Sequence, residues 1–269
     1  MTRGLFIIVA IILSLTLDIN SRVVSGVKRV SISFQKSGWF QPSRTKFALQ
    51  DVTVDFAEGI TAFCGSSGSG KSTLAKIIYG EYAREVYEGD IITDVLESEP
   101  QKLPTVYLDP FCYLTYDSTK SVGHYLKSEI MQQDRSILLE KLLTFFDLPE
   151  EKVINSLLES QKKFFEILLL FSRLKYNQNN NQNNHRGLLI LDEYLDKDMT
   201  SVRTTFFKSM RELCNSKDVI DFQVIIVSHS KSVCDSCDKV IALKNGFVYS
   251  SGAPASVMKY LPPDFVLLD

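Results

Sequence analysis

The sequence has little imbalance of charge and few of the residues that build metal sites. Its 269 residues contain 30 lysines and arginines against 32 aspartates and glutamates, so the formal charge of −2 gives no reason to expect nucleic acid or an anionic membrane as a partner. Five cysteines and three histidines include one close cysteine pair, Cys234 and Cys237, without a second pair at zinc-ligand spacing. We therefore expect neither a disulfide framework nor a zinc site, and we expect these cysteines to be small buried apolar residues.

Apolar residues, in contrast, make up 45% of the chain, which is enough to bury a sizeable core. The first apolar run, Leu5–Leu17, has 13 residues, which is short for a membrane span but suits the apolar region of a signal peptide. Small residues at Ser21, or at Ser25 and Gly26, would allow cleavage, whereas the basic residues downstream would keep that side cytosolic if the segment were an anchor. We predict that residues 1–26 are a targeting signal, with an anchor or a helix packed on the domain as alternatives.

Apolar periodicity predicts an α/β domain over residues 27–262. Alternation in "VKRVSISF" and "FALQDVTVDF" predicts two strands of an antiparallel flap, joined by a turn-like stretch over 35–45. The nearly all-apolar "GITAFC" predicts a buried strand, and "KSTLAKIIYG" predicts the helix after it. An acidic, turn-rich stretch, the buried strand "TVYL" and a helical insertion over about 118–175 follow.

The last third of the chain alternates strands and helices. An Asn-rich, low-complexity loop over 176–186 precedes this part and is too polar to pack. Strands are expected at "LLILD", "QVIIVS", "KVIALK" and "FVYSS", and helices from Met199 to about Asn215, over Lys231 to Cys237, and from Ala255. This order predicts a mainly parallel sheet with helices on both faces, followed by a tail over 263–269.

The segment "GSSGSGKS" matches the phosphate-binding pattern G-x-x-x-x-G-K-[ST] at every defined position, with a strand before it and a helix after it. Its glycines let successive backbone N–H groups turn toward phosphate oxygens, and the helix N-terminus adds positive potential. Lys71 is expected to contact the outer phosphates, and Ser72 to ligate Mg²⁺. The residues predicted to bind ATP in this loop are Gly65, Ser66, Ser67, Gly68, Ser69, Gly70, Lys71, Ser72 and Thr73.

Two later strands end in polar residues that suit hydrolysis. Four apolar residues precede Asp192, which is expected to hold Mg²⁺, and Glu193 follows at a place where a carboxylate can orient or deprotonate water. "VIIVSHS" brings His229 to a strand end as a candidate γ-phosphate sensor or general-acid partner, and a purely structural histidine is the alternative. The predicted catalytic residues are Glu193, His229 and Lys71.

These motifs, in this order, resemble the ATP-binding cassette (ABC) ATPase family from about Val27 to Met258. "GSSGSGKSTL" resembles the family's Walker A motif, "LLILDE" its Walker B motif with the catalytic glutamate, and "VSHS" its switch histidine. "CDKVIALKNGFVYSSGAPASVM" resembles the closing segment of such domains. The resemblance implies a P-loop NTPase fold in which two nucleotide-binding domains sandwich ATP and Mg²⁺.

The family's signature L-S-G-G-Q corresponds here to "LLESQ", Leu157–Gln161. Glu159 would place a carboxylate near the phosphate of a partner subunit and weaken its attraction. The remaining signature-like residues are Ser160 and Gln161, and a plain helix start with Ser160 as its cap is the alternative.

At two other places the sequence departs from the family pattern, and at a third it does not identify the family's residue. Where the family has a glutamine after a strand, this chain offers Leu108 or Asp109, which puts the Mg²⁺ and water contact of that glutamine in question. The link "EYLD" after the Walker B motif is shorter than usual. The aromatic residue that stacks on adenine is expected in the flap, with Phe34 preferred over Trp39 and Phe40.

The leading prediction is an ABC-type ATPase that works as a dimer with ATP and Mg²⁺ and drives a separate partner, either membrane transport subunits or a soluble complex. One alternative is a weakened ATP-binding module that pairs with an intact ABC subunit. A P-loop kinase is a second alternative, which the single arginine of the lid region, Arg186, argues against. The apolar N-terminus together with ATP use predicts a location at a membrane or inside an ATP-containing organelle such as a plastid.

Overall fold

The structure, a computed structural model, describes residues 24–38, 41–56, 59–93, 105–108, 116–129, 143–144, 146–173, 186–215, 221–262, 265 and 267. Most of the predicted targeting segment therefore lies outside the described residues, as does the Asn-rich loop before Arg186. Within the described ranges, none of the helices combines the length and the apolar composition that crossing a membrane requires.

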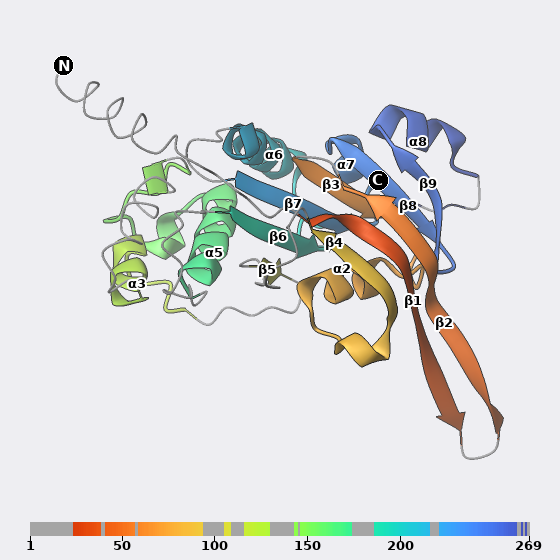
Figure 1. The fold of residues 1–269 in the computed structure, drawn as a ribbon. Coiled ribbons are helices and arrows are strands. Elements are labelled where there is room, and N and C mark those ends of the chain that lie inside the picture. The colour runs from red at the N-terminus through yellow and green to blue at the C-terminus, as the bar shows by residue number, and fades with distance from the viewer. Residues whose placement is uncertain are drawn as a thin grey trace.

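A six-stranded sheet with the order β5-β6-β7-β3-β8-β9 forms the centre of the fold (Figure 1). Its first five strands are parallel, and β9 pairs antiparallel with β8, which confirms the predicted mainly parallel sheet. The apolar runs of β3, β6, β7 and β8 become strands that are mostly buried on both faces, as parallel strands usually are, whereas β5 and β9 at the two edges of the sheet are only partly buried. The strands are β3 (Ile60–Cys64), β5 (Thr105–Leu108), β6 (Arg186–Asp192), β7 (Asp221–Ser228), β8 (Lys239–Lys244) and β9 (Phe247–Gly252).

Alternate side chains of this sheet belong to two separate hydrophobic cores. In β6, Leu188 and Ile190 pack with helix α2 (Lys71–Tyr79) and the flap, whereas Leu189 and Leu191 belong to the core on the other face. That second core also contains Phe265 from the predicted tail. The helices that contribute to it include α5 (Glu159–Arg173), α6 (Thr200–Asn215), α7 (Lys231–Asp235) and α8 (Pro254–Tyr260).

The flap is an antiparallel sheet with the order β2-β1-β4, made of β1 (Val24–Gly38), β2 (Gln41–Asp55) and β4 (Glu88–Thr93). The prediction of a turn-like stretch over 35–45 was wrong, because the two long strands stay paired to Gly38↔Gln41 and extend away from the body (Figure 1). Strand β4 was missed in the acidic stretch. It is an edge strand with exposed Glu88 and Asp90, so it lacks a strong apolar pattern.

The helical insertion contains α3 (Val122–Glu129), a short 3-10 helix η2 (Ile154–Ser156) and α5, and another 3-10 helix, η1 (Arg84–Val86), lies before β4. Stacked rings attach the insertion to the sheet domain. The Phe164 ring of α5 lies 4.3 Å from the Phe146 ring and 5.3 Å from the Phe206 ring of α6, measured between centroids. Helix α5 therefore has a fixed position relative to the sheet.

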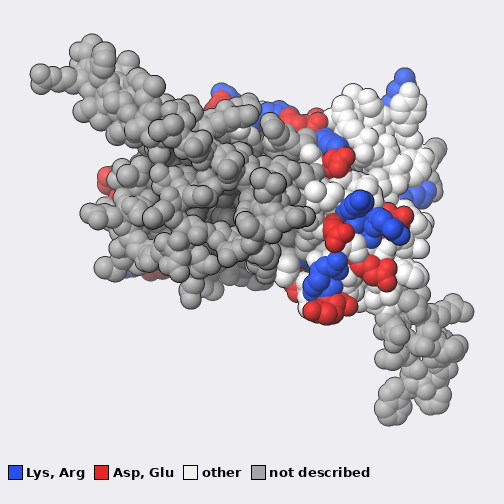
Figure 2. Space-filling view, in the orientation of Figure 1, with Lys and Arg blue, Asp and Glu red and all other residues white. Residues whose placement is uncertain are grey.

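Charged side chains of both signs are interleaved on the face shown in Figure 2. Exposed ion pairs of the flap and α2 region join Arg84 to Asp90 at 3.2 Å and Lys76 to Glu81 at 3.0 Å. Such pairs contribute little to stability because water screens them. The cysteines of "CDSC" are buried as predicted, since Cys234 and Cys237 both belong to the second core.

Candidate nucleotide-binding and hydrolytic site

The loop between β3 and α2 has a shape that only glycine permits at two of its positions. Gly65 has φ +149° and Gly70 has φ +106°, in the region that side chains rarely adopt. A Cβ atom on Gly65 would lie 2.2 Å from the carbonyl oxygen of Leu243, and one on Gly70 would lie 2.6 Å from that of Ala48. The loop is therefore pressed against two neighbouring strands, and its shape is fixed before any ligand binds.

Lys71 is folded into this loop rather than extended into solvent. It is 4% exposed, and its Nζ donates to the carbonyl oxygens of Gly65 at 2.9 Å and Ser66 at 3.1 Å. Burial lowers the pKa of Lys71, and the nearby carboxylates of Glu193 and Asp192 oppose that shift. The ammonium group lies at the centre of the loop, where it can offset phosphate charge.

The loop also contains a polar group that a bound anion would satisfy. Ser69 is 2% exposed, and its Oγ has no hydrogen-bond partner among the residues that the structure describes. A buried hydroxyl without a partner is unfavourable unless a ligand or water completes it. Together with the N-terminus of the nine-residue helix α2, this arrangement fits the phosphates of ATP.

Asp192, at the end of β6, lies beside Ser72 as the sequence predicted. Ser72 Oγ donates to Asp192 Oδ1 at 3.1 Å, and the hydroxyl of Tyr107 on β5 donates to Asp192 Oδ2 at 2.5 Å. Burial raises the pKa of this 5%-exposed carboxylate, while the two hydrogen bonds oppose the shift. Two oxygen ligands from the protein suit Mg²⁺, which keeps waters and phosphate oxygens as its other ligands.

Glu193 and His229 face each other at the ends of adjacent strands. Glu193 Oε1 lies 2.7 Å from His229 Nε2, and the backbone N–H of Glu193 donates to the carbonyl oxygen of Val227 at 2.8 Å. The Asp196 carboxylate accepts from the backbone N–H of His229 at 2.8 Å and from Ser228 Oγ at 2.5 Å. It therefore holds the segment that carries His229. Because β6, β7 and β3 are parallel neighbours, their carboxyl ends bring Glu193 and His229 to the edge where the phosphate loop begins.

The backbone of Glu193 is strained. Its φ of +53° is left-handed, which is unfavourable by about 1–2 kcal/mol for a residue with a Cβ atom. Such strain persists only where surrounding contacts fix it, and it is common at functional sites. The strand-end hydrogen bond and the histidine contact supply part of that fixation.

Comparison with known proteins decides the family. The protein-family model for the ABC transporter family matches residues 49–196, more than half of the chain, and this range includes the phosphate loop, Asp192 and Glu193. The chain belongs to the ABC transporter family. It is an ABC nucleotide-binding domain, and this assignment argues against the P-loop kinase alternative.

Relatives of this ABC domain include transport ATP-binding proteins. The Energy-coupling factor transporter ATP-binding protein EcfA1 of Mycoplasma mobile is 24% identical over 231 residues, which cover 80% of this chain and 77% of that protein. The Nisin transport ATP-binding protein NisT of Lactococcus lactis is 23% identical over 88% of this chain, but the match spans only 39% of NisT. Among solved structures, the dimeric post-hydrolysis state of the ATP-binding cassette MJ0796 bound to ADP and Pi has a TM-score of 0.54 at 18% identity, covering 85% of this chain and 98% of that one.

The signature segment of this ABC domain forms a capped helix start. Helix α5 begins at Glu159, so Ser160 lies inside its first turn and is not the cap that the sequence suggested. Gln161 Oε1 accepts from the backbone N–H of Leu158 at 3.1 Å, as the third residue of a capping box does, and Gln161 Nε2 donates to the Asp147 carbonyl at 2.7 Å. Ser160 and Gln161 are 9% and 7% exposed, whereas Leu158 is 66% exposed. Leu158 and Glu159 are therefore the side chains that this helix start presents to solvent.

Two of the remaining predictions concern aromatic and loop residues. Phe34 of β1 is 40% exposed, and its ring centroid lies 6.1 Å from that of Tyr82; Trp39 and Phe40 lie outside the described residues. Of the two candidates for the missing glutamine, Leu108 is fully buried and offers no polar atom, and Asp109 is not among the described residues.

Sequence reasoning missed three residues at or beside the site: Tyr107 and Asp196, which contact Asp192 and His229, and Tyr194, which follows Glu193 and contacts helix α5. Tyr107 lies one position before the end of the predicted strand "TVYL", where a polar hydroxyl among apolar residues was the available signal. Tyr194 and Asp196 belong to the shortened "EYLD" link, whose length was noted but whose side chains were not assigned. Each makes its contact with a residue far away in sequence or on another element.

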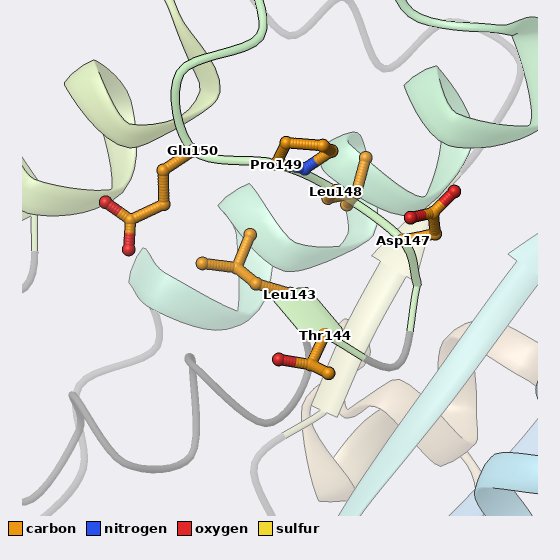
Figure 3. A pocket seen from close by; sticks show the side chains of 6 residues that line it. All are labelled: Leu143, Thr144, Asp147, Leu148, Pro149 and Glu150. Carbon is orange, nitrogen blue, oxygen red and sulfur yellow. The ribbon is translucent and has the colours of Figure 1, made fainter. Parts of the chain in front are cut away.

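A hollow of about 430 Å³ lies elsewhere, in the helical insertion, lined by Leu143, Thr144, Asp147, Leu148, Pro149 and Glu150 (Figure 3). None of these residues belongs to the phosphate loop or to the strand ends that carry Asp192 and His229. The shape of this hollow therefore has no bearing on where ATP binds.

Proposed function

We propose that this chain binds ATP with Mg²⁺ and hydrolyses it as one subunit of a dimer, and that hydrolysis drives a separate partner. The observation that carries the proposal is the pairing of Glu193 with His229 at 2.7 Å, at the same sheet edge as the Lys71 loop. One short stretch of sheet edge thus supplies three groups. They are a general base (Glu193), a residue that orients it (His229) and a cation that contacts phosphate (Lys71).

In this mechanism each side chain has one task. Glu193 accepts a proton from the attacking water, and His229 orients the Glu193 carboxylate through its Nε2 atom. Lys71 and the N–H groups at the start of α2 stabilise the charge that develops on the phosphate oxygens. Ser72 and Asp192 would hold Mg²⁺, which supplies further charge neutralisation when it is bound.

The partner that this proposal requires is a second ABC nucleotide-binding subunit. The dimeric MJ0796 cassette supports this arrangement, and the transport functions named for EcfA1 and NisT support membrane transport subunits as the driven component. We further propose that the protein works at a membrane or in an ATP-containing organelle.

The test compares the wild-type chain with Glu193→Gln. Wild type should release phosphate in a Mg²⁺-dependent manner, and the variant should release it at least about 100-fold more slowly, because general-base catalysis contributes that much. ATP, but not ADP, should dimerise the variant, measured by light scattering. Glu212→Gln, a matched change on the exposed face of α6, should retain wild-type release. Equal rates for wild type and Glu193→Gln would contradict the role of Glu193.

A second candidate function is a weakly hydrolysing ATP-binding subunit that pairs with an intact ABC subunit. The exposed Leu158 and the buried Ser160 favour it, because this end of α5 offers no side-chain hydroxyl to a nucleotide on a partner. In that case the chain alone should bind ATP through its own phosphate loop but should neither dimerise with ATP nor turn it over. Phosphate release per subunit that rises with protein concentration would argue against it, since that behaviour indicates an active homodimer.

A further inference from the structure

Helix α5 holds Tyr194, the residue that follows Glu193, at three points. Lys163 Nζ donates to the backbone carbonyl oxygen of Tyr194 at 3.0 Å and lies 3.9 Å from the centroid of its ring. Glu166 Oε2 accepts a short hydrogen bond from the Tyr194 hydroxyl. Lys163 and Glu166 are three residues apart on one helix, so they face the same neighbour together.

Both charged groups of this cluster have further partners that fix their positions. The other oxygen of Glu166 accepts from the Tyr116 hydroxyl at 3.0 Å. Lys163 Nζ also lies 3.0 Å from Asp198 Oδ2, an ion pair rather than a well-aligned hydrogen bond, and the two side chains are 15% and 19% exposed. The short link from Glu193 to Asp198 is therefore attached to α5 near both of its ends.

The two tyrosine hydroxyls act as donors to Glu166 under all ordinary conditions. Burial, together with the neighbouring Glu166 carboxylate, raises the pKa of both Tyr116 and Tyr194. Protonated hydroxyls on both sides leave the Glu166 carboxylate as the shared acceptor. Replacing this carboxylate by an amide would place an NH₂ group, which accepts no hydrogen bond, opposite one hydroxyl, and that hydroxyl would have to turn and accept from the amide instead of donating.

Glu193 needs this kind of support because its backbone is left-handed and its carbonyl side is held only weakly by its own contacts. Its N–H and carboxylate are held by β7 and His229, whereas its carbonyl oxygen accepts a long hydrogen bond, 3.4 Å, from the backbone N–H of Asp196. A rotation about the N–Cα bond of Glu193 would redirect its side chain and would move Tyr194 with it. The contacts of Tyr194 with α5 oppose that rotation.

On the proposed function, in which Glu193 is the general base, we propose that Glu166 is a positioning residue for Glu193. It anchors Tyr194 to helix α5 and thereby fixes the direction of the preceding carboxylate. The same helix begins at the signature segment, so a shift of α5 is transmitted to Glu193 through side chains of this chain alone.

The test is Glu166→Gln, studied by steady-state hydrolysis, by ATP binding and by amide hydrogen exchange. The kcat should fall about tenfold, because small misplacements of a catalytic group are costly, while the Kd for ATP stays within about twofold. Hydrogen exchange in residues 193–198 should become faster, and exchange in α2 should not change. Tyr194→Phe should give the same loss, and the double variant should be no slower than the slower single variant.

Two controls separate positioning from general damage. Tyr116→Phe removes the other hydroxyl from the same carboxylate without touching the link, so it should retain most of kcat. Glu212→Gln makes the same chemical change on exposed α6 and should alter neither readout. Unchanged exchange in 193–198 together with unchanged kcat, or additive losses in the double variant, would overturn the inference. A third outcome is that Glu166→Gln exchanges faster in residues 193–198 while the wild-type protein shows no hydrolysis. That result would uphold the attachment of Tyr194 to α5 and overturn the proposed function instead.

Discussion

Asp192 is a carboxylate that folding removes from most of the surrounding water. Burial raises its pKa, and the hydrogen bonds from Tyr107 and Ser72 offset only part of that effect. The native state therefore binds the Asp192 proton more tightly than the unfolded chain does. This difference contributes to the free energy of unfolding. The contribution is fully present at pH values below the ordinary aspartate pKa, and it is lost as the pH rises through the raised pKa of the folded protein.

We predict that Asp192→Asn, whose amide can accept from one of the two neighbouring hydroxyls and donate to the other, stabilises the nucleotide-free protein at neutral pH while weakening Mg²⁺-dependent ATP binding. The gain in the free energy of unfolding should be on the order of 1 kcal/mol, within the usual range for single substitutions. The gain should shrink as pH falls toward the ordinary aspartate pKa, since wild-type Asp192 is then protonated as well. Urea denaturation at several pH values measures both effects.

Two further variants test this prediction, one with the opposite expected effect and one as a control. Tyr107→Phe removes a hydrogen bond that favours the charged carboxylate, so it should lower the stability of the nucleotide-free protein at neutral pH. Asp235→Asn changes an exposed aspartate paired with Lys231 at 3.7 Å and should have little effect. Lower stability of Asp192→Asn at every pH would contradict the explanation from burial.

The sequence allowed the prediction of those site residues whose positions a motif defines. The phosphate loop, Asp192, Glu193 and His229 follow strands recognisable as apolar runs, so their meeting at one sheet edge could be anticipated. Tyr107 was not predicted, because its contact with Asp192 spans 85 residues and depends on β5 lying next to β6. Which side chains cross between strands is decided by packing rather than by spacing along the chain.

Among the elements, α5 begins at the segment that corresponds to the family's signature. Leu158 stands where the family has a serine and is exposed, and Glu159 carries a charge on the first turn with Lys162 2.6 Å away. Gln161 is used within the chain to hold the helix start. The arrangement is stable but presents an apolar and an acidic side chain to any nucleotide that approaches.

We predict that the triple variant Leu158→Ser, Glu159→Gly and Ser160→Gly, which produces L-S-G-G-Q, raises ATP turnover by the chain alone at least about tenfold if it forms a homodimer. The expected cause is removal of a repulsive carboxylate, addition of a hydroxyl, and closer approach of the backbone N–H groups at the two glycines to the phosphate. Phosphate release as a function of protein concentration is the measurement. Glu159→Gln alone should give a smaller rise, and no rise in either variant would contradict a limiting role for this segment.

Most elements of the sheet were predictable, since apolar runs and turn residues mark β3 and β5 to β9. The extended hairpin and β4 were not, because paired strands that leave the body or form an exposed edge need no apolar alternation. Backbone pairing with β1 determines them instead. Both boundaries of α6 and the start of α8 were predicted to within one residue.

For the whole molecule, we predict that residues 1–26 determine location. A fluorescent fusion that includes them should coincide with a membrane or organelle marker, whereas the same fusion without them should be diffuse. Identical distributions of the two fusions would contradict this role. Recovery of the cleaved protein outside the cell would contradict the proposed ATPase function, because ATP is scarce there.

The division of the hydrophobic interior by the central sheet has a consequence for cooperativity. The phosphate loop leads into α2, which packs in one core, whereas α5 and α6 pack in the other. The candidate site lies at the sheet edge where the two cores meet, so a bound nucleotide makes contacts that depend on both. Partial unfolding on either face would release the nucleotide, and nucleotide binding would make the two halves unfold as a single unit.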